Sequence, residues 1–500
     1  MARSRPAHSS TFREKVRRRL AEEIGADRGE GAFNVVLGYP SPYRVGMSSL
    51  GYQRIYRLLQ ESPGLGCERA FLDDDAKAGE PHPPVLTYES LRPVSAFPVL
   101  AVSVAYELEL AGLVQLLEGA SIPVFRDERD ERHPFVLGGG PLTFSNPTPL
   151  EPYCDAVVMG EGEEATLEVL RILEGTPKKA DRLAALAKHP HVWVPEIHGE
   201  NLASLAQCDD AMLPAWGGVR AVDTELTSMF LIETSRGCSR GCTYCVMRRS
   251  TNGGMHIVPA ERILELVPHD AKRVGLVGAA VSDHPKIVEI VRALVDRGCE
   301  VGLSSLRPDK LKPEFVQVLK DAGYRTLTTA MDGPSERVRK MLDRRAEERH
   351  LTKAAENARA AKMDRLKLYL MLGLPTETSD DVDECVRYTT ELSRIVPVAL
   401  GIAPFCPKRN TPLADAEFAG IDVVDDRLER LRRGLKGRAD VRTTSAKWAW
   451  VEAVLAKGGG REGRAVREAV AAGGTFSAYK KAFSALEPIK KAPRLQVLAG

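Results

Sequence analysis

Short apolar runs alternate with amphipathic stretches through the first third of the chain. The run FNVVLGYP begins at Phe33 and is followed, after a Gly/Ser loop, by the helical pattern YQRIYRLLQ. Apolar runs over 99–106, 134–140 and 155–164 repeat the arrangement. Strands that are apolar throughout and alternate with helices are typical of a parallel sheet covered on both faces. We therefore predict a doubly wound α/β domain over residues 31–175, preceded by a basic helix or tail over residues 1–30.

The same alternation resumes near Met229, after a polar, Pro- and Lys-containing connector over residues 176–225. Further strand-like runs, most of them separated by helical patterns, lie at 230–236, 273–280, 300–306, 324–331, 366–373 and 397–405. Such a series predicts a partial (β/α)6 TIM barrel over residues 226–420, with an active site at the carboxyl ends of its strands. Residues 421–500 are basic and rich in Ala and Gly, and we expect them to form a helical C-terminal region.

Composition narrows the class of protein. Lys and Arg number 70 against 68 Asp and Glu, so the net charge of +2 gives no argument for a nucleic-acid or membrane partner. No apolar run reaches the roughly 18 residues of a membrane span, and the basic N-terminus lacks the apolar core of a secretory signal. We expect a cytoplasmic protein, in which Trp448 and Trp450 pack a helix and do not stack on nucleic acid.

The small residues at the strand ends of the first domain are candidates for a ligand site. Ligands of open α/β sheets bind at the carboxyl ends of the strands, and small residues let the backbone approach a large flat ligand. The absence of GxGxxG after the first strand argues against a dinucleotide. The alternative is that the glycines serve tight turns only. The candidates are Ser103, Gly138, Gly139, Gly140, Gly160, Glu161 and Gly162.

The cysteines point to metal chemistry. Nine in 500 residues are too few for a disulfide framework, yet Cys238, Cys242 and Cys245 fall on one short loop after the first barrel strand. Three thiolates spaced CxxxCxxC can bind three irons of a 4Fe-4S cluster and leave the fourth iron open for a substrate or cofactor. A structural zinc site would need a fourth ligand, and the nearest candidate, His256, is poorly spaced.

Glycines and arginines within this loop fit a cluster. Gly237 and Gly241 allow the chain to wrap around it, and Arg236 and Arg240 can offset its negative charge.

CxxxCxxC with an aromatic residue before the last cysteine, here Tyr244, resembles the signature of the radical S-adenosylmethionine (radical SAM) enzymes. The resemblance implies that Cys238, Cys242 and Cys245 hold the cluster and that the amino and carboxylate groups of S-adenosylmethionine chelate the open iron. An electron from a reductant such as flavodoxin or ferredoxin then cleaves the cofactor to methionine and a 5′-deoxyadenosyl radical.

The resemblance also implies contacts to S-adenosylmethionine. Tyr244 corresponds to a residue whose backbone touches adenine, and Arg307 suits the methionine carboxylate. The segment GLVGAAVSDHP stands where relatives carry a GGEP-like strand end and departs from that pattern. The remaining candidates are Gly278, Ser282, Asp283, Ser304, Ser305, Asp332, Leu372 and Gly373.

The N-terminal segments LGYPSPYRVGMSSLGYQRIYRLLQ, VSVAYELEL, VLGGGPLTFSNPTPLEP and VVMGEGEE, with FCPKRNTPLA after the barrel, resemble an uncharacterised branch of the cobalamin-domain radical SAM class. The resemblance covers residues 31–415. It implies a cobalamin on the strand ends of the first domain, with its nucleotide tail near Ser103 and the glycines named above. The chain has no DxHxxG motif, so a bound cobalamin would lack a histidine ligand. The alternative is a domain that keeps the fold and binds no corrin.

These features predict a cobalamin-dependent methyltransferase that acts on an unactivated carbon of a small-molecule or peptide substrate. The alternatives are radical cyclisation or rearrangement, RNA modification, and an iron-sulfur scaffold or redox sensor. Methylthiotransferases of tRNA carry upstream cluster cysteines, which have no counterpart here. Cys406, at the end of the sixth barrel strand, is a candidate catalytic thiol or a packed free cysteine. His256 and His284 lie near cofactor loops as candidate proton carriers or ordinary polar residues.

Overall fold

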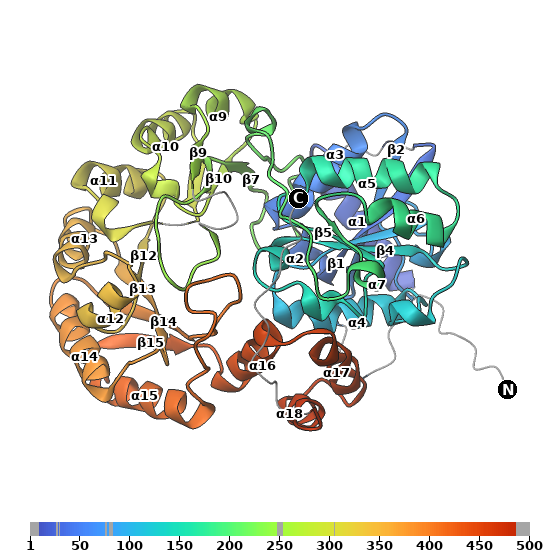
Figure 1. Cartoon of the computed structure of the whole chain (residues 1–500). Helices are drawn as coiled ribbons and strands as arrows, with labels where there is room; N and C mark the ends of the chain where they lie inside the picture. Colours follow the sequence, from blue (N-terminus) through green and yellow to red (C-terminus); the bar gives the residue numbers. More distant parts are fainter. Residues whose placement is uncertain are drawn as a thin grey trace. The chain divides into compact units, whose positions relative to one another are not determined.

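The computed structural model describes residues 10–26, 29, 31–75, 78–79, 84–247, 254–304 and 306–486 (Figure 1). The chain forms two compact units, one of Met1–Ser228 together with Val454–Gly500 and one of Met229–Ala453. In the described residues, no helix is long and apolar enough to cross a membrane.

A six-stranded sheet forms the centre of the first unit, with the strand order β2-β1-β3-β4-β5-β6. All neighbours pair in parallel except β5 and β6. The central strands are buried on both faces, which explains their continuous apolar sequence. The strands are β1 (Phe33–Pro42), β2 (Leu65–Leu72), β3 (Val99–Ser103), β4 (Phe135–Gly139), β5 (Ala156–Val158) and β6 (Val192–Trp193).

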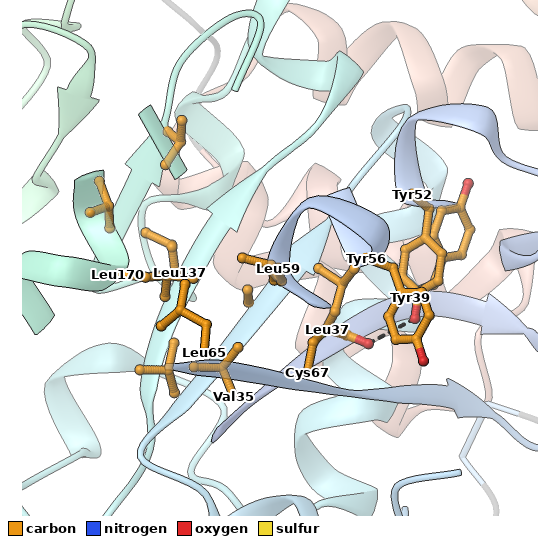
Figure 2. Packing of buried hydrophobic residues seen from close by; sticks show 14 of the residues in the cluster. Val35, Leu37, Tyr39, Tyr52, Tyr56, Leu59, Leu65, Cys67, Leu137 and Leu170 are labelled. Atoms are coloured by element: carbon orange, nitrogen blue, oxygen red, sulfur yellow. Dashed lines mark hydrogen bonds between the residues drawn. The ribbon is translucent and has the colours of Figure 1, made fainter. Parts of the chain in front are cut away.

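Helices cover both faces of this sheet. Figure 1 shows α3 and α5 on one side of the strands and α4 on the other. Figure 2 shows the core under α3 and α5, where the Tyr52 hydroxyl donates to the Leu37 carbonyl at 2.8 Å. The helices of the first unit are α1 (Ser10–Glu22), α2 (Tyr43–Gly46), α3 (Leu50–Glu61), α4 (Leu110–Gly119), α5 (Glu163–Gly175), α6 (Lys179–Leu186), α7 (Pro195–His198), α17 (Gly460–Ala471) and α18 (Phe476–Ser484).

The predicted doubly wound sheet is confirmed, and it is larger than the sequence indicates. β2 lies at one edge of the sheet although no strand was expected over Leu65–Leu72. β6 and the bridge between Gly160 and Ala206 bring part of the expected connector, residues 176–225, into the sheet. That segment is therefore packed structure with its own helices α6 and α7.

The second unit is built mainly of parallel strands that alternate with helices, as expected for a partial barrel. The strands form two hydrogen-bonded groups, in the orders β11-β10-β7 and β12-β13-β14-β15. The strands are β7 (Phe230–Glu233), β10 (Arg273–Val277), β11 (Glu300–Leu303), β12 (Thr326–Asp332), β13 (Arg365–Leu372), β14 (Val398–Pro404) and β15 (Ala439–Thr443). The helices are α9 (Ala260–Leu266), α10 (Ile287–Asp296), α11 (Pro313–Asp321), α12 (Glu336–Met341), α13 (Glu348–Ala360), α14 (Ser379–Ser393), α15 (Ile421–Gly434) and α16 (Ala446–Lys457).

The C-terminal region is helical, as expected, with one exception. β15 pairs in parallel with β14 and adds a strand that the sequence analysis did not predict. The end of α16 is held within the first unit by Asn146, whose side-chain amide donates to the carbonyls of Leu455, Ala456 and Gly458 at 2.8–3.2 Å. α17 contacts α4 of the same unit.

Candidate active site

A short antiparallel ribbon brackets the cysteine loop. β8 (Ser235–Gly237) directly follows β7 and pairs with β9 (Met255–Ile257). Gly237 has φ 80°, a left-handed conformation that favours glycine, and the Cys238 N–H donates to the Gly254 carbonyl at 3.2 Å. The loop therefore leaves and rejoins the barrel at one place, the carboxyl end of its first strand. Residues 248–253 lie outside the described part of the chain.

The middle of the loop is fixed by backbone hydrogen bonds to two distant segments. The Thr243 N–H donates to the Leu342 carbonyl at 3.1 Å, and the Leu413 N–H donates to the Thr243 carbonyl at 3.2 Å. Tyr244 packs on the apolar cluster formed by Val338, Leu342, Leu374 and Phe405. The cysteines are thus carried by a backbone that the barrel holds in position.

All three loop cysteines are free thiols; Cys242 is buried, and Cys238 and Cys245 are half-buried. Burial raises the pKa of Cys242 and of Cys245, and the charges of the neighbouring loop cysteines raise both further. In the described residues no three His, Cys, Asp or Glu side chains converge closely enough to hold a metal ion as they stand. The donor set nevertheless fits a 4Fe-4S cluster, because thiolates are the ligands that such clusters use and the three thiols are near enough to interact electrostatically.

A buried arginine lies beside the middle cysteine. Arg344 forms an ion pair with Asp332, at the end of β12, and contacts the Cys242 thiol. Burial opposes the charge of Arg344, yet Asp332 and the nearby thiol and phenol hold its pKa above its usual range. Burial and the charge of Asp332 raise the pKa of Tyr244 well above its usual range. The Arg344–Asp332 pair therefore places a guanidinium group against the Cys242 thiol.

On another side of the loop, alternating acids and bases form a network. Arg307 forms ion pairs with Asp283 and Asp309, and Arg240 reaches Asp309 at 3.1 Å. The Ser239 hydroxyl donates to Asp283 at 3.3 Å. Burial raises the pKa of Asp283, whose second oxygen, Oδ1, is buried without a hydrogen-bond partner. The network ties the cysteine loop to the ends of β10 and β11 and leaves one acceptor atom available.

The arginines expected to offset the cluster charge are engaged with carboxylates. Arg236 pairs with Glu233 at 2.9 Å, and Arg240 pairs with Asp309. Arg344, which the sequence analysis did not single out, is likewise paired with a carboxylate, that of Asp332, and in addition contacts a loop thiol.

The candidate serines at the ends of β10 and β11 form hydrogen bonds with the backbone of neighbouring segments. The Ser304 hydroxyl donates to the Gly278 carbonyl at 2.9 Å and accepts from the Gly278 N–H at 3.2 Å. The Ser282 hydroxyl accepts from the Arg307 N–H at 3.0 Å. Ser305 lies outside the described residues. These contacts hold the strand ends together; direct contact with a cofactor stays a prediction.

At the end of β13, Leu372 is buried and Gly373 turns the chain with φ 80°. The buried carboxylate of Glu377 accepts from the Gly373 N–H at 3.0 Å and pairs with Arg427 at 2.9 Å. Sequence reasoning missed Glu377 because its partner lies 50 residues away in the chain.

The remaining thiol and imidazole candidates have ordinary partners. The Cys406 thiol, after β14, donates to the Ala449 carbonyl at 3.2 Å. Nε2 of the buried His284 lies 2.8 Å from the Val258 carbonyl, while His256 is on β9 and half-buried. No described contact indicates a catalytic role for these side chains.

In the first unit, protein atoms fill the space beside most of the strand-end glycines. A Cβ on Gly138 would lie 2.7 Å from the Cys154 sulfur, one on Gly140 would lie 2.8 Å from the Val104 carbonyl oxygen, and one on Gly160 would lie 2.5 Å from the Ala206 oxygen. A Cβ on Gly139 would meet no atom closer than 3.7 Å, whereas one on Gly162 would lie 3.2 Å from the Thr166 hydroxyl and 3.3 Å from the Val158 side chain. The Glu161 carboxylate accepts from the Cys208 N–H at 2.9 Å. Close packing of the chain on itself accounts for the three tight glycines.

Comparisons with known proteins agree with the division of the chain into two units. Residues 51–195 match the model of the N-terminal region of radical SAM proteins, and residues 232–389 match the radical SAM superfamily. An uncharacterized protein of Methanocaldococcus jannaschii is 25% identical over 398 residues, covering 77% of this chain and 80% of that protein. The 2-(S-pantetheinyl)-carbapenam-3-carboxylate methyltransferase of Streptantibioticus cattleyicolor is 30% identical over 189 residues, which are 35% of this chain and 28% of that protein.

A solved structure shares the fold at low sequence identity. The cobalamin-dependent S-adenosylmethionine radical enzyme OxsB, solved with aqua-cobalamin and S-adenosylmethionine, aligns with a TM-score of 0.50 and 12% identity. The alignment covers 80% of this chain and 56% of that one. Together with the cysteine loop at the end of β7, these matches identify residues 232–389 as a radical SAM domain and residues 51–195 as the N-terminal region that accompanies it in radical SAM proteins.

Proposed function

We propose that this protein is a radical SAM enzyme that transfers a methyl group to an unactivated carbon with the help of cobalamin. The observation that carries the proposal is the set of three free thiols on a fixed loop directly after the first strand of a radical SAM domain. A 4Fe-4S cluster and S-adenosylmethionine, when bound, supply the reductive cleavage that yields a 5′-deoxyadenosyl radical.

The residues around the loop have distinct tasks in this proposal. Cys238, Cys242 and Cys245 hold the cluster, and Arg344 offsets its negative charge beside Cys242. The unpartnered Oδ1 of Asp283 would accept a hydrogen bond from the methionine amino group, and Arg307 would attract the methionine carboxylate.

The involvement of cobalamin rests on the doubly wound sheet of the first unit and on two named relatives. The carbapenam relative is named a methyltransferase, and OxsB is described as cobalamin-dependent. The strand-end glycines add little support, because the contacts of Gly138, Gly140 and Gly160 are explained by packing within the chain. We therefore assign no residue of this chain to the corrin.

Anaerobic reconstitution with iron, sulfide and cobalamin tests the proposal. We expect a corrin absorption band that remains with the protein through gel filtration, and S-adenosylhomocysteine formed together with 5′-deoxyadenosine in reactions that contain cobalamin and a methyl acceptor. Formation of 5′-deoxyadenosine without a retained corrin would overturn the methyl-transfer proposal and leave radical SAM chemistry in place.

The arrangement of the other cysteines argues against methylthio transfer to RNA. Such enzymes carry a second cluster on upstream cysteines, whereas Cys67 and Cys154 are separately buried and Cys208 lies in a loop. Within the described ranges of the first unit, no three metal-binding side chains come together.

A further inference from the structure

The strands β12 to β15 have one face that the helices do not cover. Along β13, Leu366, Leu368, Leu370 and Leu372 are buried, whereas the alternate residues Arg365, Lys367, Tyr369 and Met371 are half-buried or exposed. Figure 1 shows α13, α14 and α15 on one side of these strands. Because side chains alternate across a strand, Lys367 and Tyr369 lie on the other, inner face of the barrel.

Two polar side chains pair on this inner face. The Lys367 ammonium donates to the Tyr369 hydroxyl at 2.8 Å and lies 4.7 Å from the centre of the Tyr369 ring. Tyr369 is 45% exposed, which is unusual for a large aromatic residue in the middle of a barrel strand. Since the hydroxyl accepts from Lys367, its own proton is free to be donated to a ligand.

Both side chains lie over Gly401 of β14. Tyr369 is paired in register with Gly401, where a Cβ would lie 2.7 Å from the tyrosine ring and 3.7 Å from Cε of Lys367. Glycine at this position is therefore required for the observed placement of the ring. Gly401 is in turn paired with Arg442 on β15. The three donor residues consequently occupy one patch across three neighbouring strands.

The charges of this patch do not cancel. Arg365 is neutralised by Asp440 at 3.0 Å on the same face. Arg442 is exposed and forms no ion pair with a residue in the described part of the chain. Lys367 and Arg442 together thus leave two positive charges beside a phenolic donor, an arrangement that suits a carboxylate or a phosphate.

We propose that Lys367, Tyr369 and Arg442 form a subsite for an anionic group, a carboxylate or phosphate, of the substrate. That this anion belongs to the substrate rests on the proposed function; that the patch binds anions does not. The barrel interior is where the radical SAM proposal requires the substrate to lie.

Calorimetric titration of the reconstituted full-length protein with inorganic phosphate, and separately with acetate, tests the subsite. We expect saturable binding of at least one probe, weakened about tenfold or more by Lys367→Met and by Arg442→Met because each removes a charged donor. Tyr369→Phe retains the ring and is expected to weaken binding less. Preference for phosphate over acetate would indicate a phosphorylated substrate, and the reverse a carboxylated one.

Arg325→Met is the matched control, because Arg325 is an exposed arginine of the same unit paired with Asp364 at 2.8 Å. Its titration should match that of the wild type. Absence of saturable binding of both probes, or equal weakening by the control, would overturn the subsite. Formation of 5′-deoxyadenosine by the same wild-type preparation is measured separately; its failure with anion binding intact would overturn the proposed function and leave the subsite standing.

Discussion

Left-handed backbone conformations gather near the cysteine loop. Asp332, Asp343 and Arg345 have φ 65°, 48° and 53°, and such conformations cost a non-glycine residue roughly 1–2 kcal/mol each. Asp332 pairs with Arg344, and the Asp343 carbonyl accepts from the Cys242 thiol at 3.9 Å. Two of the three strained residues, Asp332 and Asp343, thus bring a charge and a backbone acceptor to the surroundings of Cys242, which is consistent with a functional origin of the strain.

Substitution of Gly373 by Ala tests whether packing at the end of β13 leaves room for a side chain at this position. Gly373 has φ 80°, and an added Cβ would lie 3.1 Å from Val424 and 3.2 Å from Ala419. We expect a loss of about 1–3 kcal/mol in unfolding free energy from strain and crowding together. Gly298→Ala is the control, since Gly298 has φ 79° and no atom within 4 Å of the added Cβ. Equal losses in chemical denaturation would show that the crowding contributes nothing.

Residue patterns predicted part of this site. The grouping of the Cys238, Cys242 and Cys245 thiols could be predicted because the three residues lie on one short loop. Arg344 and Glu377 were not predictable, because their ion pairs depend on partners that the barrel brings together. A single Arg or Glu in the sequence is normally expected to be a solvent-exposed side chain. Lys367 and Tyr369 were hidden within a strand whose alternate leucines dominate the pattern.

At the scale of elements, α14 depends on its N-terminal cap. Thr378 and Asp381 form a reciprocal capping box, in which the Asp381 carboxylate accepts from the Thr378 N–H at 2.7 Å. Burial opposes ionisation of Asp381, but Arg337, Ser335 and Thr378 hydrogen-bond to the carboxylate and lower its pKa from 3.8 to about 2.

A folded pKa below the unfolded pKa means that Asp381 stabilises the fold above pH 3.8 and loses this effect as the pH falls toward 2. We expect Asp381→Asn to lower the unfolding free energy by about 1–2 kcal/mol near neutral pH, with a difference that shrinks toward pH 2. Asp380→Asn, at the exposed neighbouring position, should change stability by less than about 0.5 kcal/mol. A difference for Asp381→Asn that is constant from pH 6 to pH 2 would contradict the assignment.

The elements that were not predicted have a common physical reason. β2 contains Glu68 and Arg69, and β15 contains Asp440 and Arg442, so neither shows an apolar run. Both strands lie at an edge of their sheet, where charged residues are tolerated when they are paired or exposed. The apolar central strands, buried on both faces, were predicted because tertiary structure and sequence pattern agree there.

At the scale of the whole molecule, two buried arginines form ion pairs that join segments of the first unit that are distant in sequence. Arg69 is fully buried and pairs with Glu23 at 2.8 Å and with Glu89 at 2.6 Å. Arg19 on α1 pairs with Asp74 and with Asp223, both at 2.7 Å. These contacts fasten α1 and the segment near residue 223 to the β2 edge of the sheet.

Loss of Arg69 should therefore affect the first unit selectively. We expect Arg69→Met to destabilise this unit by about 3–5 kcal/mol, because two carboxylates would stay buried without their cation. Calorimetry should show a lower midpoint temperature for the unfolding of the first unit. The iron and sulfide bound per chain after reconstitution should stay at the wild-type level. Arg132→Met, at a position 84% exposed, is the control and should leave the transition in place. Parallel loss of iron would show that the two units depend on each other for cluster binding.

Reductive cleavage of S-adenosylmethionine is the most direct test of whether the three loop cysteines are the site of radical SAM chemistry. The protein is reconstituted anaerobically with iron and sulfide, mixed with S-adenosylmethionine and a strong reductant, and assayed for 5′-deoxyadenosine by chromatography. We predict product from the wild type and from Cys385→Ala, a buried cysteine outside the loop, and none from Cys242→Ala. Cleavage by Cys242→Ala at the wild-type rate, or no cleavage by a wild-type protein that carries its full iron and sulfide, would contradict the assignment of Cys238, Cys242 and Cys245 as the site of radical SAM chemistry.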